Sequence, residues 1–203
     1  MSRREHWEHV YAERSPLEVS WYQREPVLSL RLIDHCEPGP DTPIIDVGGG
    51  ASTLVDHLLA RGHTDITVLD LAQSALDAAA ERLGDAGAGV HWEQADITAF
   101  EPSRHYGVWH DRAVFHFLVD PEDRARYRAA AEAALPAGAH LIIATFGPEG
   151  PEKCSGLPVA RYDAPSLATE LGSAFERLET RHETHQTPGG AEQAFGFHLF
   201  RRV

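Results

Sequence analysis

The chain has 203 residues, of which 42% are hydrophobic and 24% are charged, as in a globular protein of one domain. The formal net charge of −13 disfavours sequence-independent binding to the phosphate backbone of a nucleic acid. No apolar run approaches the ~20 residues of a membrane helix and no signal-peptide pattern is present, so we expect a cytoplasmic protein that binds neither nucleic acid nor membrane. Two cysteines cannot form a disulfide framework or a multi-cysteine metal site.

Short apolar runs alternate with helical stretches, which predicts an α/β fold with a parallel sheet. Residues 1–36 form an N-terminal segment with an apolar helix over 27–33. A core over 40–203 follows. The expected strands cover 43–47, 65–70, 89–93, 106–110 and 140–146, and the expected helices cover 54–59, 75–83 and 122–135. A loop at 147–151, a short helix over 165–171 and two strands over 175–183 and 194–201 follow. The short connection between these two strands makes them antiparallel.

A glycine-rich turn lies between the first core strand and its helix, with the sequence Asp46-Val47-Gly48-Gly49-Gly50-Ala51-Ser52. Such a turn lets a ligand approach the amides of the helix start. Asp70 ends the next strand about 20 residues later, where an acid can bind ribose hydroxyls. A tight turn without a ligand is the alternative, but the glycine-rich turn together with Asp70 favours an adenosine-type site.

Two classes of cofactor compete for this site. A dinucleotide fingerprint requires a third glycine at position 53, where this chain has Thr53. The chain also has the antiparallel pair of C-terminal strands where a dinucleotide-binding fold has its second nucleotide-binding half. A sulfonium cofactor without phosphate is therefore favoured over NAD, and an oxidoreductase is the weaker alternative.

At these residues the sequence resembles the class I S-adenosylmethionine-dependent methyltransferases. The turn resembles their first motif, Val68-Leu69-Asp70 their ribose-binding motif, Gln94-Ala95-Asp96-Ile97 their adenine-contacting turn, and Asp111 their motif near the reacting methyl. The resemblance implies a single Rossmann-like domain, with seven mostly parallel strands, an antiparallel C-terminal strand, helices on both faces and a helical N-terminal lid. It implies S-adenosylmethionine as cofactor, S-adenosylhomocysteine as product, and cofactor contacts from Asp46, Gly48, Gly49, Gly50, Ser52, Asp70, Leu71, Asp96, Ile97, Asp111 and Arg112.

The N-terminal segment contains Trp7-x-x-x-Tyr11 and then Ser20-Trp21-Tyr22-Gln23. It is similar to the corresponding segment of small bacterial methyltransferases, and it also resembles that of thiopurine and thiol S-methyltransferases and that of elongation-factor lysine methyltransferases. This similarity implies that Trp21, Tyr22 and Gln23 belong to a lid over the cofactor. Trp7 and Tyr11, four residues apart, are more typical of helix packing. Cys154, Arg161 and Tyr162 are further candidates for acceptor contacts, with an idle thiol and a surface salt bridge as the alternatives.

Three ionisable residues near the fourth strand are the candidate catalytic bases: His110, Asp111 and His116. An ion pair between Asp111 and Arg112 and a core role for His116 are the alternatives. His182 and His185 face opposite sides of their strand, so we expect no metal site.

Motifs that the chain lacks exclude several classes of methyl acceptor. The absence of asparagine excludes the Asp-Asn pair of metal-dependent catechol methyltransferases. Asp111-Arg112-Ala113-Val114 stands where adenine and amide methyltransferases carry an aromatic motif. We therefore expect a metal-independent enzyme, a monomer or homodimer, acting on a small molecule, plausibly a thiol or another soft nucleophile. A protein lysine methyltransferase and a non-catalytic cofactor-binding protein are the alternatives.

Overall fold

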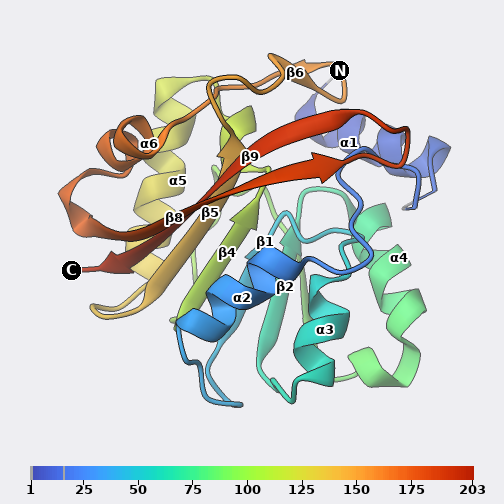
Figure 1. Cartoon of the computed structure of the whole chain (residues 1–203). Coiled ribbons are helices and arrows are strands. Elements are labelled where there is room, and N and C mark those ends of the chain that lie inside the picture. Colours follow the sequence, from blue (N-terminus) through green and yellow to red (C-terminus); the bar gives the residue numbers. More distant parts are fainter. Residues whose placement is uncertain (1, 16) are drawn as a thin grey trace.

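A central sheet organises the chain in the computed structural model, which describes residues 2–15 and 17–203 (Figure 1). In these residues the sheet has seven strands in the order β3-β2-β1-β4-β5-β9-β8. Strands β1 to β5 are parallel, whereas β9 runs antiparallel to β5 and β8 antiparallel to β9. The bounds are Ile44–Val47 (β1), Ile66–Asp70 (β2), His91–Gln94 (β3), Val108–Arg112 (β4), His140–Phe146 (β5), Phe175–Gln186 (β8) and Glu192–Arg202 (β9). This is the Rossmann-like fold that the sequence predicts.

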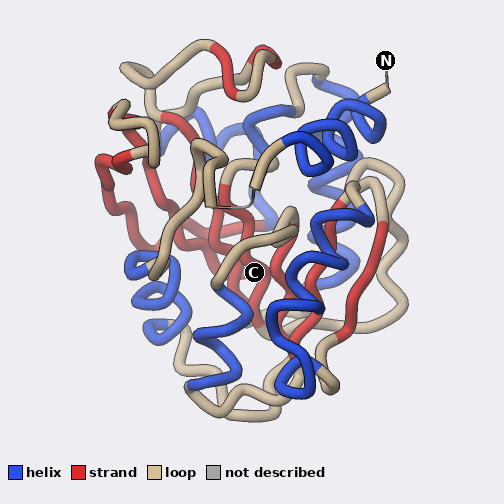
Figure 2. The backbone as a smooth tube through the Cα atoms, turned by 90° about the vertical axis from the view of Figure 1, so that its right-hand side faces the viewer, coloured by secondary structure: helices blue, strands red, loops and turns tan. Residues whose placement is uncertain are grey.

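Helices cover both faces of the sheet (Figures 1 and 2). Helices α2 (Val27–His35), α3 (Leu54–Ala60) and α4 (Gln73–Leu83) pack on one face, and α5 (Pro121–Ala134) and α6 (Ala164–Leu171) pack on the other. Along β5, Leu141 and Ile143 join one apolar cluster while Ile142 and Ala144 join the other. Burial on both faces explains why this strand is a continuous apolar run.

Helix α1 (Arg3–Glu13) differs from the others because it buries none of its residues. Its start is fixed locally by a capping box, in which the Ser2 hydroxyl accepts from the Glu5 N–H and the Glu5 carboxylate accepts from the Ser2 N–H. The helix packs against α4 at the edge of the sheet where the parallel strands end. It is therefore an addition to the core.

Several boundaries differ from the sequence-based expectation. The third and fourth strands begin two residues later than predicted, because the N–H groups of Val90, Tyr106 and Gly107 donate to the carbonyls of Gly87, Ala134 and Pro43 and not to a neighbouring strand. A small hairpin of β6 (Lys153–Cys154) and β7 (Leu157–Pro158), which was not predicted, follows the proline-rich loop. Strands β8 and β9 are both longer than predicted. None of the helices in the described part of the chain is long and apolar enough to span a membrane.

Candidate active site

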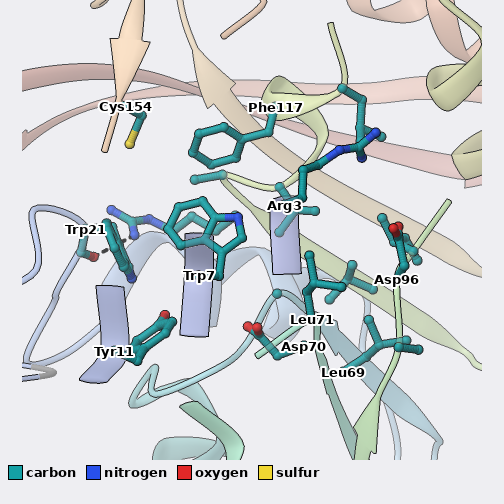
Figure 3. A pocket seen from close by; sticks show the side chains of 18 of the residues that line it. Arg3, Trp7, Tyr11, Trp21, Leu69, Asp70, Leu71, Asp96, Phe117 and Cys154 are labelled. Atoms are coloured by element: carbon teal, nitrogen blue, oxygen red, sulfur yellow. Dashed lines mark hydrogen bonds between the residues drawn. The ribbon is translucent and has the colours of Figure 1, made fainter. Parts of the chain in front are cut away.

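A cavity opens at the edge of the sheet where the parallel strands end, beneath α1 (Figure 3). Its volume is about 850 Å³, counting space open to solvent. The lining residues come from α1, the segment before α2, the ends of β1 to β4, the β6–β7 hairpin and β9. Segments far apart in the sequence therefore meet around one space.

The glycine-rich turn after β1 requires residues without side chains. Gly48 and Gly50 have φ angles of +68° and +41°, in the left-handed region. A Cβ atom on Gly49 would lie 2.6 Å from Oδ2 of Asp46 and 2.7 Å from Cγ1 of Val68, and one on Gly48 would overlap Val114. The turn thus keeps the backbone open beside the cavity.

Asp70 ends β2 and faces this space between Tyr11 and Leu71 (Figure 3). Its Oδ1 accepts a hydrogen bond of 2.9 Å from the N–H of Ala72. Burial raises the pKa of the Asp70 carboxyl to about 7, and the negative charges of Asp46 and Glu8 act in the same direction. Among the described residues no cation lies within ion-pair distance of this carboxylate.

Asp96 lines the same cavity from the turn after β3. Its Oδ1 accepts from the N–H and the hydroxyl of Thr98, at 2.9 and 2.7 Å. Leu71 and Ile97 add apolar surface beside it. Three strand ends thus place Gly48, Asp70 and Asp96 around one space, as parallel topology predicts.

A smaller hollow of about 520 Å³ lies on the other side of the glycine turn and is lined by Tyr22, Gln23, Asp46, Gly49 and Ser52. Oδ1 of Asp46 lies 2.7 Å from Nδ1 of His110, whose Nε2 lies 2.9 Å from the Ser29 hydroxyl. All three side chains are buried. His110 therefore orients Asp46 and is held on both ring nitrogens.

Asp111 and His116 do not occupy the positions expected of catalytic bases or cofactor ligands. Asp111 is fully buried, and its oxygens accept from the N–H groups of Val114 and Phe115 and from the Tyr127 hydroxyl, at 2.9, 3.1 and 2.7 Å. No ion pair joins it to Arg112 within the described residues. His116 is fully buried too, and burial together with the positive charge of Arg112 lowers its pKa to about 3. Both side chains lie in the core behind the cavity wall.

The predicted lid residues border both hollows. Trp21 lines the large and the small hollow, and Tyr22 and Gln23 line the small one. Trp21 makes an edge contact with Trp7 at 5.6 Å between ring centroids, and Trp7 packs on Phe117 at 5.1 Å. Trp7 and Tyr11 thus line the cavity while they pack.

The remaining candidates divide between the cavity and other places. Cys154 lines the cavity, and burial raises the pKa of its thiol (Figure 3). Arg161 instead bonds to the Gly150 carbonyl and Glu152, and Tyr162 is buried against Phe115. The expectation that these two contact the acceptor is wrong for this arrangement, because loop packing turns both away. Across residues 2–15 and 17–203, no group of three or more His, Cys, Asp or Glu is arranged to hold a metal ion.

The lining residues that were not predicted include Arg3, Phe117, Leu118, Gln193 and Phe195. Gln193 and Phe195 are two residues apart on β9, so they share a face. The alternation along this strand could have placed them together, but only the topology brings β9 beside the strand ends.

A comparison with known proteins identifies the core. Residues 44–138, which contain the glycine turn, Asp70, Asp96 and Arg112, match a family described as "Methyltransferase domain". The chain carries a methyltransferase domain. The matched family is one of enzyme domains, and solved structures of the same fold contain bound S-adenosylhomocysteine or S-adenosylmethionine. No curated protein sequence matches the chain.

Solved structures with the same fold align with nearly the whole chain. A SAM-dependent methyltransferase from Anabaena variabilis has a TM-score of 0.77 at 15% identity, covering 100% of this chain and 96% of its own. The N-methyltransferase NodS from Bradyrhizobium japonicum, in complex with S-adenosylhomocysteine, has a TM-score of 0.74 at 18% identity, with 98% and 97% covered. The 1,6-didemethyltoxoflavin-N1-methyltransferase from Burkholderia thailandensis, with bound substrate and S-adenosylhomocysteine, has a TM-score of 0.73 at 17% identity, with 98% and 87% covered. At these identities the likeness shows the fold alone.

Proposed function

We propose that this methyltransferase acts without a metal on a small molecule whose acceptor atom is already nucleophilic, such as a thiolate. The proposal rests on the observation that none of the three candidate bases is free to take a proton from an acceptor. His110 is held by Asp46 and Ser29, and Asp111 and His116 lie in the core. A hydroxyl or ammonium acceptor must lose a proton first, whereas a soft thiolate needs only positioning.

The residues present fit the cofactor. The amides of the glycine turn, where side chains would collide, lie between the two hollows. Asp70 and Asp96 supply acceptors for an adenosine moiety in the large hollow, and Asp46, Ser52 and Gln23 supply polar groups for an amino acid moiety in the small one. When bound, S-adenosylmethionine supplies a methyl group on a sulfonium, which leaves as S-adenosylhomocysteine when a nucleophile attacks the carbon in line.

The chain's own contribution is to exclude water and to orient the acceptor. Trp7, Trp21 and Phe117 form an aromatic roof over the large hollow. We propose that residues 1–36 act as the lid of a single domain over residues 1–203. A roofed hollow suits a small acceptor better than a side chain presented by a folded protein.

The proposal is tested with cofactor labelled in its methyl group, offered together with a thiol panel, matched alcohols or whole-cell protein. We expect label in methylated thiols and none in alcohols. Label confined to protein bands would contradict the small-molecule acceptor and favour the lysine alternative. Tight S-adenosylhomocysteine binding with no turnover of any acceptor would favour a non-catalytic protein.

A matched glycine pair tests the cofactor site in the same assay. Gly49→Ala places a Cβ within 2.7 Å of Asp46 and Val68, whereas Gly89→Ala points into open space. We expect the first variant to lose cofactor binding by about tenfold or more, and the second to bind as the parent does. Equal binding by both variants would show that the turn does not hold the cofactor.

A further inference from the structure

Arg112 ends β4 with its guanidinium inside the protein, where both hollows meet. Nη1 donates a hydrogen bond of 2.9 Å to the carbonyl of Trp21, and Cζ lies 4.7 Å from the ring centroid of Phe195. These two contacts fix the plane of the guanidinium. Arg112 is thus held in place from the lid and from β9.

One edge of this guanidinium has no partner. Nε and Nη2 are buried, and neither has a hydrogen-bond acceptor among residues 2–15 and 17–203. These two nitrogens form the edge that receives both oxygens of a carboxylate in a bidentate pair. A buried donor pair left unsatisfied costs free energy, so this edge favours a partner that supplies two acceptor oxygens.

Among the described residues Arg112 has no ion-pair partner, and the negative charges of Glu183 and Asp46 act on it only from beyond ion-pair distance. Burial lowers its pKa to about 10, so the side chain remains a cation at neutral pH. The nearby Glu183 accepts from Gln23 at 2.8 Å, and in the described part of the chain no carboxylate lies within salt-bridge distance of Arg112. A buried cation without a partner favours an anion in the adjacent space.

The surroundings of Arg112 belong to the large hollow. Phe195, on which the guanidinium stacks, lines that hollow, as do Cys154 and Gln193. The Gln193 amide oxygen is buried and has no partner among the described residues. Trp21 and Phe117 add aromatic walls. Two unpartnered polar side chains thus face a compartment with aromatic sides.

We propose that this compartment binds an acceptor that is a planar aromatic carboxylate, with its carboxylate on the Nε–Nη2 edge of Arg112 and its ring between the aromatic walls. The amide oxygen of Gln193 accepts a hydrogen bond from a donor group on the same methyl acceptor. This inference rests on the proposed function and names the acceptor class. It also reassigns Arg112, which the sequence places among the cofactor ligands, to the acceptor.

The test uses the full chain saturated with S-adenosylhomocysteine, with benzoate and its neutral twin benzamide as probes in calorimetry. We expect benzoate to bind about tenfold to a hundredfold more tightly than benzamide, the range for hydrogen bonds to a charged partner. In Arg112→Gln this preference disappears. In Arg112→Lys, which keeps the charge but not the bidentate edge, it falls to an intermediate ratio.

Arg201→Gln is the matched control, because it removes the same charge from an exposed position on the same strand as Gln193, where Arg201 pairs with Glu176. A general loosening of the lid would weaken the binding of both probes, so the ratio of their dissociation constants would not change. Thermal unfolding checks that each variant folds. We expect Arg201→Gln to keep the full preference.

Three results would overturn the inference: equal binding of the two probes to the parent, an unchanged preference in Arg112→Gln, or competition between benzoate and S-adenosylhomocysteine. The last would place the carboxylate of the cofactor on Arg112. Failure of the parent to bind S-adenosylhomocysteine would instead refute the proposed function, so the two failures are distinct.

Discussion

Asp70 is the residue whose ionisation gives the clearest prediction, because burial raises its pKa to about 7. The ionised carboxylate accepts hydrogen bonds from ribose hydroxyls, whereas the protonated form loses part of that capacity. We expect the affinity for S-adenosylhomocysteine to fall as the pH is lowered through about 7. Calorimetry between pH 5.5 and pH 8.5 would measure this. Asp70→Asn should bind about tenfold more weakly at pH 8 and lose the pH dependence near 7. A slope that persists in this variant would assign it to another group.

The same shift predicts how the free protein responds to pH. The pKa of Asp70 is raised in the fold from its ordinary value of 3.8, so its contribution to stability is fully present below about 3.8 and is lost as the pH rises through about 7. Asp70→Asn removes a buried charge at pH 8. We expect its melting temperature without ligand to rise there, by about 2–4 °C for each kcal/mol gained. Asp96→Asn is the control, and a lower melting temperature for Asp70→Asn would contradict the account.

Substitution of Asp111 distinguishes a general base from a buried carboxylate that stabilises the fold. Its carboxylate fixes the start of the turn after β4 and accepts from Tyr127. We expect Asp111→Asn to lower the free energy of unfolding by about 1–3 kcal/mol. At a temperature where both proteins are folded, kcat should change less than about threefold. Loss of a general base would cost about a hundredfold or more, so a loss of that size would restore Asp111 to a catalytic role.

At the scale of elements, Glu8 of α1 caps the start of α4. Helix α4 has no capping side chain of its own, and Glu8 of α1 accepts from the N–H groups of Gln73 and Ser74 and from the Ser74 hydroxyl, at 2.7, 3.2 and 2.6 Å. A carboxylate at a helix start also interacts favourably with the helix dipole. The contact therefore holds the roof of the cavity closed.

Glu8→Gln should weaken this contact and release the ligand faster. We expect the dissociation rate of S-adenosylhomocysteine to rise about threefold to tenfold, since a cap is worth about 1 kcal/mol. Stopped-flow tryptophan fluorescence would follow it, because Trp7 and Trp21 line the cavity. Glu13→Gln, at the exposed end of α1, is the control. Equal rates for the two variants would show that Glu8 does not fasten the lid.

The ionisation of Glu8 sets the pH range of this contact. Partial burial raises the pKa of the Glu8 carboxyl, but the hydrogen bonds from Ser74 and Gln73 outweigh it, so the pKa lies below its ordinary 4.5. With a lowered pKa, the contact contributes fully above about 4.5 and is lost as the pH falls through the lowered value. Lid opening by acid is therefore separate from the loss of affinity near pH 7 that Asp70 causes.

Elements buried on both faces were predictable from the sequence, and those that depend on pairing were less so. The apolar run of β5 was predicted with its observed bounds because all of its residues after His140 are buried. The hairpin of β6 and β7 has only two residues in each strand and no apolar pattern. Strand β8 is mostly exposed toward its end, so its extension depends on pairing with β9.

Site residues divide in the same way. The glycine turn and Asp70 follow one another at fixed spacings, so the sequence placed them beside the cavity. Gln193 and Phe195 reach it only because β9 inserts next to β5, which no local pattern reveals. Asp111 directly follows the expected strand over 106–110, but its orientation into the core depends on Tyr127 of α5.

At the scale of the whole molecule, the stable core and the lid are separate parts. The two apolar clusters lie on the two faces of the sheet and contain no residue of α1. Trp7, Tyr11 and Glu8 of α1 contact the cavity and the start of α4 instead. The architecture therefore assigns folding to residues from α2 onward and closure of the site to α1.

Deletion of residues 2–14 tests this division. We expect the shortened protein to unfold cooperatively, with a melting temperature within about 4 °C of the parent's, because little apolar surface leaves the core. Saturating S-adenosylhomocysteine should raise the parent's melting temperature but barely that of the shortened protein, since ligand stabilisation scales with affinity. Differential scanning fluorimetry with and without ligand measures both effects. A shortened protein that fails to unfold cooperatively would show that α1 belongs to the folding core, whereas an undiminished ligand shift would show that α1 does not close the site.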